Sequence, residues 1–246
     1  MIRSWRGLVL VGVLTMILGL LVTFPARVAF QWFMPTALTV SGIQGTVWAG
    51  NASEASVSGI YCQDILWRMN PLRLFAGEVS YNVSAKPVRG FVESDVSLGF
   101  GGVLSLSNLS AALPLDLIAG ASGVRDLQGN ASLTFERVAI VNGLATAADG
   151  TLQVANLIIP IISRDSLGGY KAEFFTQNNG IAASIEDTDG VVDLAGSFLL
   201  RADRTYEFTG QVIAKPETPQ ALRQQLVNLP PMNSPGQKEI RLEGVF

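Results

Sequence analysis

Three carboxylates stand close together at Glu186, Asp187 and Asp189, and paired acids are the side chains that hydrolyse glycosidic bonds. They lie beside Gly190 in a segment with the composition of a turn, where aspartate is favoured because its side chain hydrogen-bonds to nearby backbone. The spacing Asp187-x-Asp189-Gly190 supplies only part of the oxygen donors that a calcium loop needs. We therefore interpret the cluster as structural, and we expect no metal ion or other cofactor.

Other sequence signatures of catalysis are also missing. The 246 residues include no histidine, which excludes histidine-based catalysis and histidine metal sites. The glycine-rich segment 99–102 has no phosphate-binding lysine and no strand-to-helix context. A Gly-x-Ser-x-Gly nucleophile motif does not occur. The sequence therefore predicts a protein that is not an enzyme.

Charge and cysteine content narrow the partners and the means of stabilisation. The net charge is −3, from 17 basic and 20 acidic residues, and no basic cluster favours nucleic acid. Cys62 is the only cysteine, so a disulfide within the chain is impossible. Its strand-like context, Ile60-Tyr61-Cys62, favours a buried apolar role over a disulfide between two chains.

The longest apolar segment is the uncharged run of eighteen residues 7–24. As a helix it would span about 27 Å, close to the roughly 30 Å hydrocarbon core of a bilayer. A cleaved signal peptide is the alternative, but its apolar region is typically about 7–15 residues, and cleavage after Ala26 or Ala29 lacks the small-x-small pattern. We predict an uncleaved anchor. Its apolar residues are Leu8, Val9, Leu10, Val11, Val13, Leu14, Ile17, Leu18, Leu20, Leu21 and Val22.

The charges that flank this run predict its orientation and the division of the chain. Arg3 and Arg6 precede the run and Arg27 alone follows it closely, so the positive-inside rule keeps the amino tail in the cytoplasm. We expect a tail and anchor in residues 1–27, an interfacial helix or linker in 28–38 that ends at Pro35, and an exported domain in 39–246.

Beyond residue 38 the apolar residues alternate with polar ones. This period of two is typical of strands with one face on a core and one in water. The clearest alternating segments are 79–85, 131–135, 170–174 and 206–214, and turn signals stand at 101–102, 149–150, 178–180 and 189–190. The sequence predicts a mainly β protein: an amino-terminal transmembrane helix, then an antiparallel β-rich domain with one or two short helices.

Helices and repeats are few in the predicted domain. One helix is expected from Thr218 as N-cap, with Pro219 as its first helical residue, to about Leu229, and a short turn is expected at 114–119. Segments 64–87 and 193–216 share six of 24 positions, including Ala-Lys-Pro at their ends. They are a possible duplicated strand unit, with chance similarity as the alternative.

Two segments combine tryptophan with glycine or proline. Each reads as a strand with one tryptophan in the core, bounded by glycines that permit a turn or bulge, and the proline ends the second strand. The residues concerned are Gly45, Trp48 and Gly50 in the first segment and Trp67, Pro71 and Gly77 in the second.

The order of these motifs resembles protein N of the type II secretion system. A G-x-V/L-W-x-G strand just past one amino-terminal anchor and an L-x-W-x-x-x-P-x-x-x-x-x-G unit are similar to that family, as are the helix at 222–229 and the strand at 240–246. The resemblance implies a single-pass inner-membrane protein with a periplasmic β domain that takes part in export across the outer membrane. It implies other secretion-system subunits and the lipid bilayer as partners, and it offers no catalytic residues.

A second hypothesis is a membrane-anchored β-groove protein that binds or transfers lipid or other hydrophobic ligands. The two hypotheses differ in where the apolar side chains of the strands point. These side chains would fill a closed core in the first case and line an open trough in the second. The residues that distinguish them are Tyr81, Val83, Phe135, Phe174, Tyr206 and Phe208.

Overall fold

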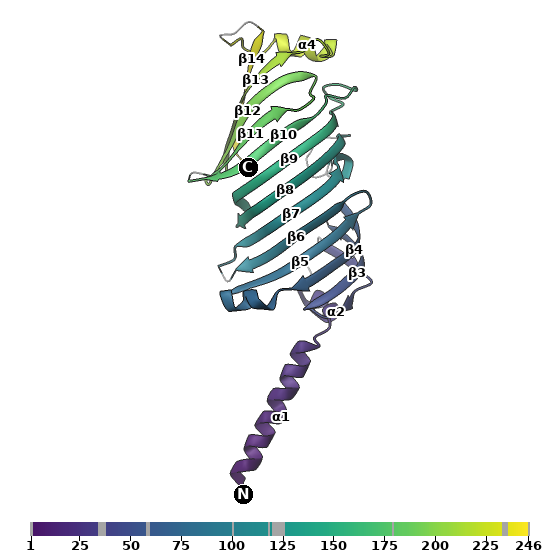
Figure 1. The fold of residues 1–246 in the computed structure, drawn as a ribbon, viewed down its shortest axis with the longest axis vertical. Helices are drawn as coiled ribbons and strands as arrows, with labels where there is room; N and C mark the ends of the chain where they lie inside the picture. The colour runs from purple at the N-terminus through teal and green to yellow at the C-terminus, as the bar shows by residue number, and fades with distance from the viewer. Residues whose placement is uncertain are drawn as a thin grey trace.

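A computed structural model of the chain consists of an amino-terminal helix followed by one large β-sheet (Figure 1). The structure describes residues 2–33, 38–57, 60–99, 101–117, 119, 126–178, 180–232 and 236–245. Of residues 2–6, 33 and 57 it describes only the backbone. Helix and sheet follow one another along the long axis of the molecule (Figure 1).

The amino-terminal region forms two helices, α1 (Ile2–Val22) and α2 (Ala26–Phe33). Helix α1 ends just ahead of Pro25, because a proline disfavours helical geometry in the residue before it. Helix α2 is the short helix expected within 28–38 but begins earlier, and the end expected at Pro35 lies outside the described residues. Within the described part of the chain, no helix combines the length and the apolar character needed to cross a bilayer.

In the part of the chain that the structure describes, the sheet has fourteen strands and every strand pair is antiparallel. From β3 onward each strand pairs with the next one in the chain, so the sheet extends strand by strand away from α1 (Figure 1). Strands β1 and β2 both pair with β3. The strands are β1 (Leu38–Ser41), β2 (Gln44–Gly45), β3 (Ala49–Val57), β4 (Ile60–Met69), β5 (Glu78–Pro87), β6 (Phe91–Gly99), β7 (Leu104–Pro114), β8 (Gln128–Val141), β9 (Leu144–Ile158), β10 (Tyr170–Gln177), β11 (Gly180–Asp187), β12 (Val192–Arg201), β13 (Thr205–Ala214) and β14 (Gln237–Val245).

The prediction of a mainly β, antiparallel domain is confirmed, and the four alternating segments lie in β5, β8, β10 and β13. The prediction of a turn at Asp149-Gly150 is wrong, because both residues lie inside β9. Gly150 stands opposite Phe135, and a Cβ atom at Gly150 would lie 2.7 Å from Cδ1 of that ring. The glycine therefore marks a close approach within a strand.

The helix expected from Thr218 is α4 (Gln220–Val227), with Pro219 as its N-cap and not as its first helical residue. The Thr218 hydroxyl donates to the carbonyl oxygen of Val191 at 2.6 Å and accepts from the amide of Lys215 at 2.8 Å. Thr218 thus holds the preceding turn against β12. The short turn expected at 114–119 contains η2 (Leu115–Leu117).

The two similar segments occupy similar places in the fold. Segment 64–87 covers most of the antiparallel pair β4 and β5, and segment 193–216 covers the pair β12 and β13. The turn η1 (Pro71–Ala76) joins the first pair, whereas only three residues, 202–204, separate the strands of the second. A common origin of the two pairs stays a prediction.

One face of the sheet is mainly apolar, and we call it the apolar face. Directly opposed residues on neighbouring antiparallel strands share a face, so the register shows which side chains lie on it. Phe135 and Val138 both lie on this face because the register shift between Phe135 and Arg137 is a bulge that restores the alternation. One row is Met69, Tyr81, Val96, Leu106, Val138 and Ala148, and another is Leu109, Phe135, Gly150, Phe174, Ala183, Phe198, Phe208 and Leu242.

Of the elements that the structure describes, helices cover the apolar face at its two ends. Near α1, Ala26 and Phe30 of α2 pack with Trp67 and Ala52. At the far end, Leu222 and Leu226 of α4 pack with Val192 and Val212. The six distinguishing residues, from Tyr81 to Phe208, are all half-buried; Tyr81 and Val83 pack at the α2 end, and the other four lie outside both helix-covered clusters. Among the described residues no second layer of strands lies over this face, so these residues do not form a closed sandwich core.

Candidate functional site

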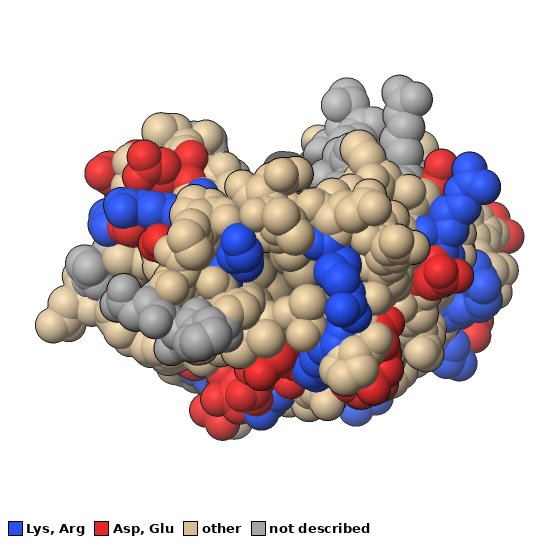
Figure 2. All heavy atoms as spheres, turned by 90° about the horizontal axis from the view of Figure 1, so that it is seen from above, with Lys and Arg blue, Asp and Glu red and all other residues tan. Residues whose placement is uncertain are grey.

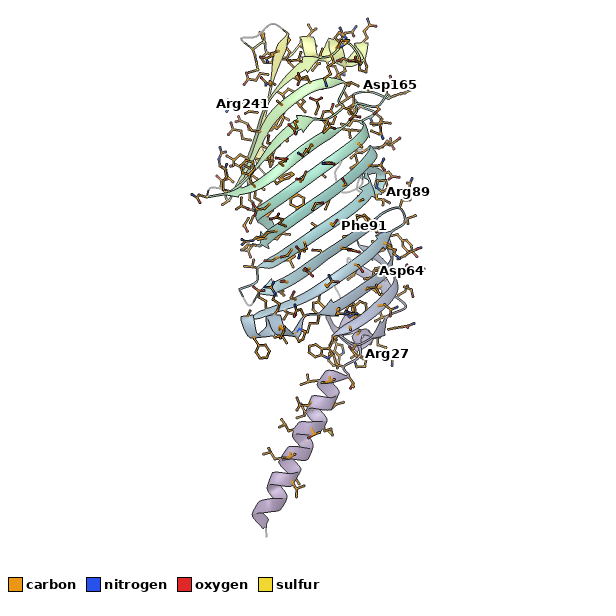
Figure 3. The ribbon with its side chains drawn as sticks, viewed as in Figure 1. Arg27, Asp64, Arg89, Phe91, Asp165 and Arg241 are labelled. Atoms are coloured by element: carbon orange, nitrogen blue, oxygen red, sulfur yellow. The ribbon has the colours of Figure 1, made fainter. Side chains whose placement is uncertain are left out.

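The junction between α1 and the sheet is held by hydrogen bonds from residues 46–48. The indole Nε1–H of Trp48 donates to the carbonyl oxygen of Leu21 at 2.8 Å, and the amide of Val47 donates to the carbonyl of Phe24 at 3.1 Å. Pro25 and Thr46 form an isolated β-bridge beside them. The last carbonyls of a helix lack partners within it, so Trp48 caps α1 from the sheet. Figure 3 labels Arg27 at the same junction.

Trp48 does not occupy the core position expected for it. Its ring is half-buried at the junction, where its indole N–H donates to the end of α1. The motif residue Gly45 has φ of +88°, a backbone conformation that residues with a Cβ rarely adopt. This glycine permits the tight turn that brings Trp48 to the helix.

Trp67, in contrast, is buried, with 9% of its surface exposed. Its Nε1–H donates to the carbonyl oxygen of Thr46 at 3.0 Å, and its ring centroid lies 5.6 Å from that of Phe30. Gly50 is its partner on β3, and a Cβ atom there would lie 2.5 Å from Cζ2 of the Trp67 ring. Gly50 therefore makes room for the indole.

The other two motif residues define the turn η1 between β4 and β5. Pro71 is at its start, where the Asn70 side chain accepts from the amide of Leu72 at 3.1 Å. Gly77, with φ of +77°, ends the turn, and its amide donates to the carbonyl of Leu74 at 3.1 Å. The turn leaves Phe75 92% exposed. It lies at the end of the sheet from which α1 departs (Figure 1).

An apolar cavity of about 510 Å³ lies on the apolar face where α2 meets the first strands. Phe30 reaches it from α2, Cys62 and Ile65 from β4, and Tyr81 and Val83 from β5. None of its described lining residues carries a charge. Its volume falls in the range of about 300–1,000 Å³ that is usual for small-molecule sites. The cavity is therefore the candidate binding site of this chain.

The two titratable groups in the cavity are kept neutral. Burial raises the pKa of the Cys62 thiol, and burial likewise raises the pKa of the Tyr81 hydroxyl. Both groups are therefore uncharged near neutral pH, and the cavity presents a surface without formal charge. The lone cysteine is half-buried here, in β4.

The carboxylates that the sequence brings together take part in local contacts. Asp187 accepts from Nζ of Lys215 at 2.6 Å and from the amide of Leu194 at 2.8 Å. Burial alone would raise the pKa of Asp187, but these hydrogen bonds and the charge of Lys215 outweigh it and lower that pKa. Glu186 lies 3.9 Å from Nζ of Lys171. Nowhere in the described chain do three or more His, Cys, Asp or Glu side chains gather as a metal site would require.

Charged side chains of both signs are interspersed on the surface. Figure 2, which views the molecule from above, has blue and red residues side by side and no broad area of one sign. Glu207, for example, accepts from Arg201 at 2.9 Å and from Arg241 at 3.3 Å. The face in that view lacks the single-sign cluster typical of nucleic-acid-binding surfaces.

Sequence reasoning missed two parts of this site. The cavity joins Phe30, Cys62 and Val83, which are far apart in the chain, and only the fold brings them together. The exposure of Phe75 could not be foreseen, because its segment has the sequence pattern of a strand end. The signal that could have found it is Asn70-Pro71 followed by Gly77, which are the start and stop residues of a short helical turn.

The fold and the site define a class of protein: an apolar amino-terminal helix attached to an antiparallel sheet with an open apolar face. Residues 36–241 match the model of the family described as type II secretion system (T2SS), protein N. The chain is also similar to type II secretion system protein N of Vibrio cholerae serotype O1, with 24% identity over 244 residues that cover 92% of each chain. No solved structure matches the chain. The chain belongs to the type II secretion system protein N family, and this confirms the resemblance seen in its motifs.

Proposed function

We propose that this chain is a non-enzymatic inner-membrane component of the type II secretion pathway, which takes part in export across the outer membrane through a periplasmic β domain. Family membership carries the proposal, because the match spans residues 36–241 and so includes almost all of the sheet. The absence of histidine from the sequence supports a role without catalysis.

In this proposal α1 is the membrane anchor. Its eleven apolar anchor residues, from Leu8 to Val22, are all exposed and point in every direction around the helix. Such a surface is stable in hydrocarbon and costly in water. The uncharged part of α1, residues 7–22, spans about 24 Å at about 1.5 Å per residue, which is less than the roughly 30 Å hydrocarbon core of a bilayer.

In this proposal the end of the sheet next to α1 faces the bilayer. Phe75, on the turn η1, is exposed at that end, and Trp32 of α2 is 69% exposed close to Phe24, with ring centroids 6.0 Å apart. Aromatic side chains of this kind are enriched at membrane interfaces. The basic residues Arg3 and Arg6 ahead of the anchor favour a cytoplasmic amino terminus and a periplasmic sheet.

Other secretion-system subunits are the proposed partners of the sheet. Among the described residues, β14 (Gln237–Val245) pairs only with β13, apart from the contacts of residues 230–232 with 237–239, so its outer edge beyond residue 239 can accept a strand from another protein. Leu242 and Val245 on this strand are exposed. Pairing at this edge would extend the sheet away from the membrane.

The experiment that tests the proposal is deletion of the gene in a bacterium with an active type II system, followed by an assay of secreted hydrolases in the medium. We expect secretion to fall and to be restored by the full chain supplied in trans. A chain with Leu14 and Leu18 both replaced by Arg, which cannot insert, should not restore it. Undiminished secretion after deletion, with the rest of the system intact, would contradict the proposal.

One observation favours a second function, the binding or transfer of lipid or other hydrophobic ligands. Four of the six side chains that distinguish a closed core from a trough lie half-buried outside the clusters that α2 and α4 cover, namely Phe135, Phe174, Tyr206 and Phe208. Native mass spectrometry of the detergent-extracted chain tests this function. A co-purifying lipid supports it, and a protein mass without any adduct counts against it.

A further inference from the structure

The cavity between α2 and strands β3 to β6 has a lining that selects for hydrocarbon. Its polar groups are few, and Trp67 already donates its indole N–H to Thr46. Cys62 and Tyr81 stay neutral there. A ligand with charge or with several hydrogen-bonding groups would lose its hydration without finding partners, which is unfavourable. An alkyl chain, unbranched or branched, has no polar groups whose hydration would be lost when it enters.

The cavity opens onto the rest of the apolar face. Tyr81 and Val96 line the cavity and belong to the row that continues through Leu106 and Val138. A long alkyl chain can therefore extend beyond the cavity along the sheet and keep apolar contacts. A compact ligand would use only one end of this surface.

The position of the cavity in the fold indicates where the alkyl chain comes from. Only three residues, 23–25, separate the end of α1 from α2, and Ala29 and Phe30 of α2 line the cavity. With α1 in the bilayer, the cavity stands at the membrane surface, within reach of the lipids around the anchor. The nearest source of alkyl chains is then the bilayer itself.

We propose that this cavity binds one acyl chain of a phospholipid drawn from the bilayer around α1, with Phe30 of α2 and Ile65, Val83 and Ala85 of the sheet in contact with the chain. The proposal rests on α1 being the membrane anchor. It makes the membrane-proximal end of the sheet a lipid site and the apolar face its continuation.

The test uses the full chain reconstituted into vesicles of phosphatidylethanolamine and phosphatidylglycerol. A small fraction of the phosphatidylethanolamine carries a diazirine near the end of one acyl chain. After irradiation, peptide mass spectrometry locates the labelled residues. We expect label in α1, which contacts lipid in any case, and in peptides of β4 and β5 that contain Ile65 and Val83.

A cavity-filling variant makes the result specific. Ala85→Phe places a ring in the cavity from a half-exposed position, and Ala145→Phe makes the same change on β9, outside the cavity. Circular dichroism confirms that both fold. We expect Ala85→Phe to reduce label in β4 and β5 to the level of an unirradiated sample while label in α1 stays unchanged, and Ala145→Phe to change neither.

The outcomes separate the cavity from the anchor. Label in α1 without label in β4 and β5 overturns the acyl-chain site and leaves the anchor in place. Label in β4 and β5 that is as strong in Ala85→Phe as in the unmodified chain also overturns the site. Absence of label from α1 overturns the anchor, and with it this inference.

Discussion

Replacement of Trp67 by alanine tests how α2 packs on the first strands of the sheet. The indole is buried, packs against Phe30 and covers Gly50. Loss of a buried tryptophan side chain costs about 3–5 kcal/mol of unfolding free energy. The substitution also leaves the Thr46 carbonyl without its donor, which adds to the cost if that carbonyl stays shielded from water.

The size of the effect can be expressed as a melting temperature. For chains of about 150–250 residues, 1 kcal/mol corresponds to roughly 2–4 °C, so Trp67→Ala should lower Tm by roughly 6–20 °C. The assay is thermal unfolding of the full chain in detergent, followed by circular dichroism of the sheet. Trp67→Phe should recover part of the loss, because it keeps an aromatic ring and lacks only the N–H donor.

The matched control is Trp32→Ala. Trp32 is exposed, and its only described ring contact is with Phe24. Its removal should cost no more than about 1 kcal/mol. If Trp67→Ala lowered Tm no more than Trp32→Ala does, the packing of α2 on the sheet described above would be wrong.

Three further predictions follow from the same contacts. Gly50→Ala should destabilise the chain by about 1–3 kcal/mol in urea unfolding, because the added Cβ meets the Trp67 ring. In the control Gly99→Ala the added Cβ lies 3.9 Å from its nearest neighbour, so the substitution should cost less than about 1 kcal/mol. The fold lowers the pKa of Asp187 below 3.8, so the contribution of this carboxylate to stability is complete above that pH and is lost as the pH falls through the folded-state pKa. The free energy of unfolding in urea, measured at pH 7 and pH 3, should therefore depend less on pH in Asp187→Asn than in the unmodified chain. Equal pH dependence in the two chains would contradict the ion pair with Lys215. Because burial raises its pKa, Cys62 should react with iodoacetamide at pH 8 more slowly in the folded chain than in urea, and equal rates would place the thiol outside the cavity.

The strands were predictable because their alternation is local. In β5, β8, β10 and β13 the alternation of apolar and polar residues indicates which side chains face water. The alternation does not record what covers the other face. A strand such as that around Phe135 has the same pattern in a sandwich as in an open trough, so the single layer could be learned only from the fold.

The tryptophan motifs show the same limit at the level of single residues. Trp48 and Trp67 stand in similar local patterns, yet one caps α1 and the other fills the core. Which tryptophan becomes buried depends on where the chain carries Leu21 and Phe30, which the local pattern does not contain. Gly150 was misread for a related reason, since a glycine that admits an aromatic ring looks in sequence like a glycine that makes a turn.

The state of the amino terminus in cells tests the central claim, that α1 tethers the sheet to the inner membrane, most directly. The measurement is the intact mass of the chain in membrane and soluble fractions after washing with alkaline carbonate. We expect the full 246-residue chain, retained in the washed inner membrane. A mature chain that begins near Val28 or Phe30 and leaves the membrane in the wash would contradict it.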